Sequence, residues 1–335
     1  MASFQKRGPY QWRALIRRTG YPTQSRTFET KDEAIAWARD IESSMDKSIF
    51  VDRSKAERTT FNEAIDWHLK NITPRHKGSD SESMRLKRFQ REESKLCAYA
   101  MANLKPDHFE DYRDRRLKIV KPGTVTRELN LLHAVFKHSA RRLALLENPL
   151  TEVKRPKVYD ERDVRFHDDE EERLMNALST CRNPYIRPAV VLALETAMRR
   201  SELLSLKWND IDLRNATAKL HDTKNGESRE VPLSKNALKT LKELKREQDE
   251  DTVVSLDLRV LKTSANSLKH SFQRARARAE MEHFNFHDLR HEAVSRLFER
   301  GWEAIKVAAV SGHKDMQSLK RYANFKAKDL AKELG

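Results

Sequence analysis

The sequence is poor in the residues that cross-link or interrupt a chain. Its 335 residues include 2 cysteines, 8 glycines and 10 prolines. Two cysteines, Cys97 and Cys181, cannot build the disulfide framework of a small secreted protein, so we expect reduced thiols in the cytoplasm. Scarce glycine and proline, together with 35% charged residues, favour many surface helices joined by few turns.

Long apolar runs are also missing. The longest one, Ala189–Leu194, has six residues, whereas a membrane-spanning helix needs about 20. The opening stretch MASFQKRGPYQWRALIRR contains no apolar core of a signal peptide, so we expect neither secretion nor a membrane partner. With 38% hydrophobic residues the chain can still bury real cores, and its length predicts two or three domains.

Acidic residues are too few to balance the basic ones. The chain has 66 Lys and Arg against 51 Asp and Glu, which gives a formal charge of +15. Residues 51–160 hold the largest local excess, with 24 basic against 16 acidic residues. This balance favours a polyanionic partner, with nucleic acid ahead of an anionic membrane. The middle third is the region in which we expect the main electrostatic contact with that partner.

Periodicity and composition divide the chain into three predicted domains, in a fold that is mainly α with small β elements. Residues 1–56 are predicted to form a small β-sheet with one helix, and residues 57–157 an all-helical domain. Residues 165–335 are predicted to form a mixed, mostly helical domain. The stretch VKRPKVYDERDVR, residues 153–165, lacks apolar periodicity and is interpreted as a linker.

The first predicted domain carries basic residues on one strand. Residues 10–17, YQWRALIR, alternate between an apolar face and a mostly polar face that includes Arg13 and Arg17. A return strand is predicted over residues 25–28, and Thr30 begins a capped helix. The basic face is either a DNA-binding surface or a solvated sheet edge, and the residues alone leave both open.

The second predicted domain combines helical periodicity with dense positive charge. The stretch TVTRELNLLHAVFKHSARR, from Thr124, places apolar residues on one face and Arg127 and Arg141 outside it. We expect Glu147-Asn148-Pro149 to end this helix. Several cationic helices share the segment, so DNA contact is preferred over a merely solvated face.

The third predicted domain begins with a capped helix and contains one hairpin. Asp168, together with Glu171, is expected to cap the helix. Residues 216–222 and 228–233 are strand-like, and the Asn225-Gly226 pair between them is a strong signal for a tight turn.

Histidines in this domain raise the possibility of a metal site. His287 and His291 are one helical turn apart in HDLRH, and His313 is a third candidate ligand. The stretch is not HExxH, no acidic or cysteine cluster completes a site, and Arg290 would oppose a dication. We therefore predict no metal.

A phosphate site fits the residues better. Arginine binds phosphate with a planar fork that stays charged, and Arg199 and Arg290 supply two such groups. Lys224 lies at the predicted hairpin tip, where an extended side chain can reach a ligand. Tyr322 is the only tyrosine after Tyr185, and it follows His313 by nine residues. Each residue alone has an ordinary structural explanation, but their joint order favours function.

In this order the motifs resemble those of the tyrosine recombinases, the phage integrase family of site-specific DNA recombinases. TAMRRSELLSLKWNDID, from Thr196, is similar to the first arginine box of the family, and KNGESREVPL, from Lys224, to its hairpin lysine. HDLRH, from His287, resembles its His-x-x-Arg box, and SGHKDMQSLKRYAN, from Ser311, its histidine-then-tyrosine ending. The resemblance covers nearly all of residues 165–325.

The rest of the chain matches more weakly. TVTREL and ENPL resemble parts of the family's core-binding domain, and PYQWRALIRRTGYP resembles its arm-type DNA-binding module. Ala197 is a departure, because the family usually has glycine there. Alanine is small, and we expect it to be tolerated.

The resemblance implies roles for the matched residues. Tyr322 would attack the scissile phosphate, Arg199 and Arg290 would hold its non-bridging oxygens, and Lys224 would protonate the departing 5′-oxygen. The product would be a 3′-phosphotyrosine with a free 5′-hydroxyl, formed without cofactor or metal.

Supporting roles follow in the same way. His287 and His313 would hydrogen-bond the phosphate and assist proton transfer, and His291 would pack or support from the next turn. Glu202 could orient an arginine or be an ordinary surface residue.

The implied protein is the integrase of a prophage or other mobile element. It would act as a homotetramer on double-stranded DNA attachment sites in the cytoplasm, associated with the nucleoid. A DNA-bending accessory protein and an excision factor are open as further partners. Two alternatives are a type IB topoisomerase, which uses the same tyrosine chemistry, and a DNA-binding regulator that has lost catalysis.

Overall fold

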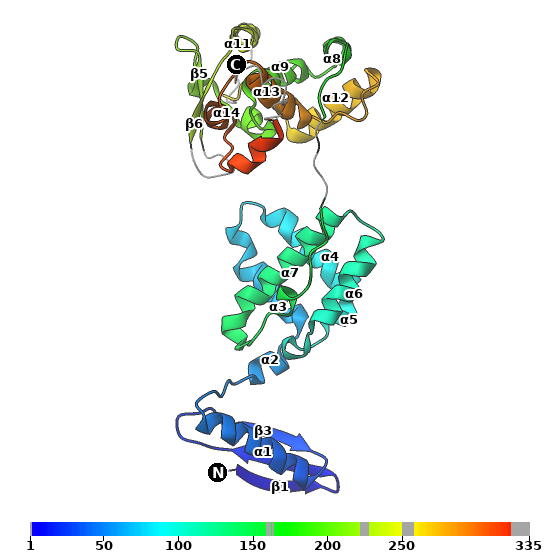
Figure 1. The fold of residues 1–335 in the computed structure, drawn as a ribbon, viewed down its shortest axis with the longest axis vertical. Coiled ribbons are helices and arrows are strands. Elements are labelled where there is room, and N and C mark those ends of the chain that lie inside the picture. Colours follow the sequence, from blue (N-terminus) through cyan, green and yellow to red (C-terminus); the bar gives the residue numbers. More distant parts are fainter. Residues whose placement is uncertain (1, 159–161, 163, 222–227, 250–257, 323–335) are drawn as a thin grey trace, which may run out of the picture. The chain divides into compact units, whose positions relative to one another are not determined.

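The computed structural model describes residues 2–158, 162, 164–221, 228–249 and 258–322. The chain divides into two compact units, Met1–Asp160 and Glu161–Gly335. Most of the described chain is helical, and two small antiparallel sheets accompany the helices, which confirms the predicted fold class (Figure 1). Within these ranges no helix has the length and apolarity to cross a membrane.

The first unit begins with a three-stranded sheet that one helix covers. The elements are β1 (Ala2–Gly8), β2 (Gln11–Ile16), β3 (Gln24–Phe28) and α1 (Lys31–Asp46), with strand order β1-β2-β3. Ala14 and Ile16 point to the buried face of β2, as the alternation predicts. The predicted cap at Thr30 is present, because its side chain accepts from the backbone N–H of Glu33. Strand β1 was not predicted, because ASFQKRG shows no regular alternation.

The remainder of the first unit is helical. It contains α2 (Ser54–Arg58), α3 (Phe61–Asn71), α4 (Ser79–Glu92), α5 (Ser94–Cys97), α6 (Pro106–Leu117) and α7 (Pro122–Leu143). The rings of Phe61, Phe109 and Phe136 form the centre of its core, with centroids 5.1–5.9 Å apart. This core and the cluster around Ile16 are separate sets of apolar contacts. The division of residues 1–157 into two domains stays a prediction.

The end of α7 differs from the prediction. The helix stops at Leu143, several residues before Glu147-Asn148-Pro149. Ala144 adopts a left-handed conformation with φ 51°, and its N–H and that of Leu145 both bond to the carbonyl of Ala140. The left-handed residue therefore terminates the helix before the proline is reached.

The second unit is built from helices and one small sheet. Its helices are α8 (Glu170–Ser179), α9 (Ile186–Thr196), α10 (Arg200–Ser205), α11 (Lys235–Asp249), α12 (Ala265–Arg278), α13 (Asp288–Glu299), α14 (Ala304–Ser311) and the 3-10 helix η5 (Met316–Tyr322). The sheet has the order β4 (Ile211–Asp212), β5 (Thr217–Leu220), β6 (Arg229–Pro232). Helix α9 is buried along almost its whole length and packs against α11 and α13 (Figure 1).

The predicted hairpin is confirmed in its two strands, since Leu220 pairs with Arg229 and Ala218 with Val231. The two-residue strand β4 was not predicted. The predicted turn at Asn225-Gly226 lies outside the described residues.

The predicted cap of α8 is wrong. Asp168 has φ 42° and lies outside the helix, and the N-cap position belongs to Asp169, whose side chain makes no capping bond. The carboxylate of Glu170 accepts the backbone N–H of His167 instead, at 2.9 Å. The backbone N–H of His167, just before the helix, is therefore bonded by a side chain of the helix itself.

Candidate active site

The His-x-x-Arg box lies at the start of α13. His287 is the N-cap residue, and Asp288 in the first turn accepts the backbone N–H of Asn285 at 2.8 Å, which fixes the entry to the helix. Arg290 points into the protein and is only 4% exposed. Its Nη1 donates to the carbonyl of Ala197 and its Nη2 to the carbonyl of Ser311, both at 2.6 Å.

The first arginine box places a second guanidinium beside this one. Arg199 is the N-cap of α10, and its backbone N–H donates to the carboxylate of Glu202 at 2.8 Å. Its side chain also bonds Glu202 through Nη1 at 2.8 Å, and Nη2 donates to the carbonyl of Gly312 at 2.9 Å. Glu202 therefore contacts both the backbone and the side chain of Arg199, as expected of a residue that orients an arginine.

Arg229, the first residue of β6, is a site residue that sequence reasoning missed. Its Nη1 and Nη2 donate to the two carboxylate oxygens of Glu202, at 3.0 and 2.8 Å. Its Nε donates to the carbonyl of Val310 at 3.1 Å. The residue stands inside the KNGESREVPL motif, but nothing local in the sequence indicates that it returns to Glu202.

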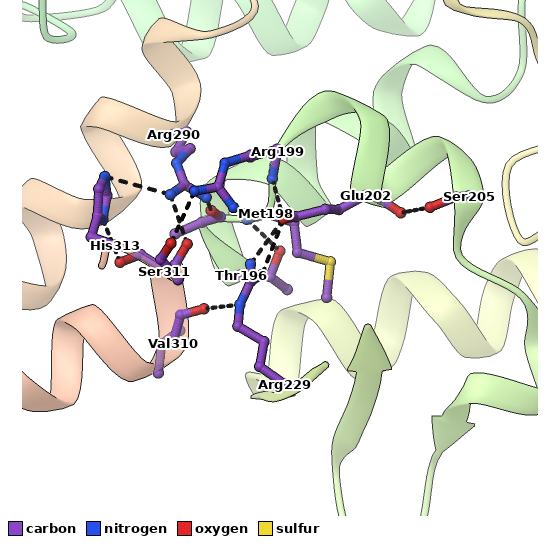
Figure 2. Close-up of polar contacts among 12 residues, drawn as sticks. Thr196, Met198, Arg199, Glu202, Ser205, Arg229, Arg290, Val310, Ser311 and His313 are labelled. Carbon is purple, nitrogen blue, oxygen red and sulfur yellow. Dashed lines mark hydrogen bonds and ion pairs between the residues drawn. The ribbon is translucent and has the colours of Figure 1, made fainter. Parts of the chain in front are cut away.

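Three arginines thus donate hydrogen bonds to three consecutive carbonyls at the C-terminus of α14. Arg229 bonds Val310, Arg290 bonds Ser311 and Arg199 bonds Gly312. The last carbonyls of a helix lack partners within the helix and carry partial negative charge, so guanidinium groups suit them. Figure 2 shows the side chains of Arg199 and Arg290 meeting above this helix end, with Arg229 reaching it from the sheet.

The charge in this cluster is unbalanced. Burial raises the pKa of Glu202, but the hydrogen bonds from Arg229 and Arg199 outweigh it and lower the pKa to about 2. Burial, followed by the charge of Arg199, lowers the pKa of Arg290 to about 10. Among the described residues no carboxylate lies within ion-pair distance of Arg290. A buried cation without an ionic partner is costly, so the site is suited to receive an anion.

Two histidines flank the arginines. The Oγ of Ser311 donates to the carbonyl of Val307 at 2.6 Å and lies 2.7 Å from Nδ1 of His313, an arrangement that favours the proton on Nδ1. Nε2 of His313 then faces Nη2 of Arg290 at 3.5 Å. The side chain of His287 is exposed to solvent on one side. The protein around the ring still desolvates it in part, and this effect, followed by the charge of Arg290, lowers its pKa.

The tyrosine of the last motif also reaches this site. Tyr322 ends η5, and its hydroxyl is hydrogen-bonded to Nδ1 of His291. Its ring lies nearly parallel to that of Phe298, with centroids 6.4 Å apart, and 6.4 Å from the ring of His313. Helix α13 therefore carries both an arginine for the anion and a contact to the hydroxyl.

Ala197, the position at which the sequence departs from the family pattern, has φ 51°. This is the left-handed region in which glycine is favoured, and the residue forms the C-cap of α9. Its methyl group is buried in a small apolar cluster with Ala293 and Val294, and its carbonyl accepts from Arg290. Alanine is therefore accommodated, with a strained backbone.

Arginines at the start of the unit hold α13 from the other side. Arg162 donates to both oxygens of Asp288, at 3.3 and 2.7 Å, and Arg165 donates to both oxygens of Glu292, at 3.0 Å each. Asp288 and Glu292 are 1% and 3% exposed and bracket Arg290 in the sequence. The segment predicted as a linker thus ends in contacts that fix the helix of the site.

Five predicted residues remain, four of them in the first unit. Lys224 is outside the described residues. In the first unit, Arg13 donates from Nε to Ser25 Oγ at 2.8 Å, and Arg17 is exposed. Arg127 and Arg141 are exposed on α7, outside its apolar stripe. Their contact with DNA stays a prediction.

Comparison with known proteins identifies the class. Residues 165–328 match the model of the phage integrase family. An integrase/recombinase of Haemophilus influenzae is 33% identical over 343 residues, covering 99% of this chain and 88% of that protein. The shufflon-specific DNA recombinase of Escherichia coli is 35% identical over 293 residues, covering 84% of this chain and 73% of that protein.

A solved structure supports the fold. A lambda integrase dimer bound to a core site aligns with a TM-score of 0.66 at 19% identity, over 95% of this chain and 93% of that one. The chain belongs to the phage integrase family of tyrosine recombinases. It is a site-specific DNA recombinase, and these relationships do not favour the topoisomerase or the inactive regulator.

Proposed function

We propose that Tyr322 is the nucleophile of this recombinase and that Arg199 and Arg290 hold the scissile phosphate. The observation that carries this assignment is the unbalanced arginine cluster, with Arg290 buried and no carboxylate beside it among the described residues. The ring of Tyr322 lies at the same site, with its centroid 6.4 Å from that of His313. An anion bound between the two arginines would therefore meet both the nucleophile and its electrostatic support.

The chemistry follows from this arrangement. The phenolic oxygen of Tyr322 forms a bond to phosphorus, and the bond from phosphorus to the 5′-oxygen breaks. Lys224, at the predicted hairpin tip, gives a proton to the departing oxygen. His287 donates a hydrogen bond to the phosphate, and His313 does so through Nε2 when its imidazole is protonated. The resulting 3′-phosphotyrosine keeps the energy of the phosphodiester, so a second 5′-hydroxyl can reverse the step without ATP.

The assembly that we propose is a homotetramer on two double-stranded DNA attachment sites, acting in the cytoplasm at the nucleoid. A solved lambda integrase tetramer bound to a Holliday junction shares the fold, with a TM-score of 0.63 at 18% identity. The biological outcome would be integration or excision of a mobile element. A DNA-bending protein and an excision factor are further partners to test.

The direct test uses a nicked suicide substrate that carries the ends of the element, obtained by sequencing the DNA that flanks the gene. Loss of the short fragment after the nick would trap the covalent intermediate. The wild-type chain should form a protein–DNA adduct that survives denaturation, and Tyr322→Phe should bind the DNA without forming one. An adduct formed by Tyr322→Phe would refute the assignment of the nucleophile.

The same assay tests the source of positive charge. Because arginines supply the charge around the phosphate, cleavage should persist in EDTA. If EDTA stops cleavage and added magnesium or zinc restores it, a metal ion takes part and the role of the arginines must be revised.

A further inference from the structure

The hydroxyl of Tyr322 is hydrogen-bonded to Nδ1 of His291, and the two rings lie 5.7 Å apart at 30°. His291 directly follows Arg290, so the two side chains leave α13 in directions about 100° apart. Arg290 enters the arginine cluster, while His291 turns toward η5. Neither of the histidines for which the sequence predicted a part in proton transfer occupies this position.

The contact results from the packing of one face of α13. His291, Val294 and Phe298 follow one another at spacings of three and four, so they share a face of the helix. Val294 is fully buried, and Phe298 packs in the same apolar cluster as Tyr322. The apolar part of this face supports the ring of the tyrosine, and its polar end receives the hydroxyl.

We propose that His291 is a catalytic residue that accepts the proton of the Tyr322 hydroxyl as the phenolic oxygen attacks phosphorus. This rests on the proposed function. The O–H bond of Tyr322 breaks and an N–H bond forms at Nδ1 of His291, while the oxygen forms the bond to phosphorus. The 5′-oxygen leaves with a proton from Lys224, and in the rejoining step His291 returns its proton to the departing tyrosine.

The neighbouring groups support this assignment. Nδ1 of His313 lies 2.7 Å from Ser311 Oγ, and Nε2 of the same ring faces Nη2 of Arg290 at 3.5 Å. The ring of His287 stands perpendicular to that of His291, 5.0 Å away, at the exposed rim. A phenol has a pKa of about 10 and an imidazole about 6.5, so complete transfer before attack is unfavourable and transfer during attack is expected.

The test is single-turnover cleavage of the suicide substrate by three proteins: wild type, His291→Phe and His291→Asn. Phenylalanine removes both the base and the hydrogen bond. Asparagine keeps a polar atom near the position of Nδ1 but is not basic. We expect His291→Phe to cleave about 10²-fold more slowly, and His291→Asn to remain at least about tenfold slow, with DNA binding unchanged.

A second substrate separates the nucleophile from the leaving group. Replacing the 5′-bridging oxygen by sulfur gives a leaving group that needs no proton. The defects of both His291 variants should persist on this substrate, whereas the defect of Lys224→Ala should largely disappear. Rescue of the His291 variants by sulfur would mean that His291 acts on the leaving group and would overturn the proposal.

Two further results would also overturn it. Cleavage by His291→Asn within about threefold of wild type would reduce His291 to a residue that only places the tyrosine. Cleavage by both variants at the wild-type rate would remove it from the reaction. If the wild type itself forms no adduct, the proposed function fails instead. Thermal unfolding checks both variants, and if the Phe variant does not fold, the Asn variant and the sulfur substrate decide.

Discussion

Nη2 of Arg290 donates to the carbonyl oxygen of Ser311 at 2.6 Å, which joins the His-x-x-Arg box to the end of the helix that precedes the tyrosine. Nη1 of the same guanidinium is held by the carbonyl of Ala197. The arginine is thus fixed at both nitrogens before any DNA arrives. A donor that is already oriented needs no rearrangement when charge develops on the phosphate.

Arg199→Ala and Arg290→Ala should each impair cleavage far more than binding. Loss of one oriented donor typically lowers a rate by about 10²–10³. Loss of one phosphate contact should lower the salt slope of binding by about one unit. Single-turnover cleavage and equilibrium binding, measured at one salt concentration, would separate the two effects.

Arg200→Ala is the matched control for this pair. Arg200 is exposed in the first turn of α10, and no hydrogen bond or ion pair of it occurs within the described residues. Its variant should cleave at nearly the wild-type rate. If Arg199→Ala or Arg290→Ala cleaves within about threefold of wild type at saturating protein, that residue does not hold the phosphate in the transition state.

Gly312→Ala should disrupt the site through Arg229. Gly312 has φ +70°, and a Cβ there would lie 2.8 Å from Cζ of Arg229. Gly301 has a similar φ of +79°, but a Cβ there would meet no atom within 4 Å, so Gly301→Ala isolates the backbone cost. That cost is about 1–2 kcal/mol, and displacing Arg229 from buried Glu202 should add about 1–3 kcal/mol.

Denaturant unfolding and cleavage assays on both glycine variants would measure this difference. Gly301→Ala should be less stable but should cleave normally. Equal losses of stability and activity in the two variants would show that contact with Arg229 has no special importance.

Glu202 should make stability depend on acid pH. Its pKa is lowered to about 2 in the folded protein from a value of 4.5, and a lowered acid pKa stabilises the fold above the unfolded value. This contribution is present above pH 4.5 and declines as the pH falls toward the folded pKa. Between pH 5 and pH 3 the stability advantage of wild type over Glu202→Gln should shrink by about 2 kcal/mol.

Urea unfolding of the two proteins across this range is the measurement. Other carboxylates titrate equally in both, so the difference between the proteins reports on Glu202. A difference that stays constant from pH 5 to pH 3 would contradict the lowered pKa.

Two alanines in left-handed conformation should respond differently to glycine. Ala144 and Ala197 both have φ 51°, and glycine would relieve about 0.5–1 kcal/mol of net backbone cost at either one. Ala197 is 1% exposed, so removing its methyl group would forfeit about 0.8 kcal/mol of burial. Thermal unfolding should show that Ala144→Gly stabilises the protein and that Ala197→Gly is close to neutral. The reverse ranking would refute this comparison.

The sequence was most informative where a residue type has few alternatives. Arg199, Arg290, His313 and Tyr322 stand in motifs whose order is specific, and the structure brings all four into one site. The strand alternation around Ala14 likewise required no knowledge of the rest of the fold.

The features of the site that could not be predicted from the sequence depend on contacts between distant segments. Arg229 bonds Glu202 across 27 positions and Val310 across 81, and His291 meets Tyr322 across 31. Local rules failed at Asp168 because the carboxylate of Glu170 satisfied the backbone from inside the helix. Strand β1 is stabilised by its pairing with β2, and this pairing cannot be predicted from the residues of β1 alone.

The ion pair between Arg162 and Asp288 affects where the chain can be cleaved without losing a contact of α13. A fragment that begins at residue 165, the boundary suggested by periodicity, keeps Arg165 and its bonds to Glu292 but discards Arg162. The carboxylate of Asp288, which is 1% exposed and lies in the same helical turn as Arg290, would lose its ionic partner. A protease that cleaves just before Arg162 would keep this ion pair in one fragment, whereas cleavage between Arg162 and Arg165 would separate Arg162 from Asp288 and keep only the contacts of Arg165 with α13.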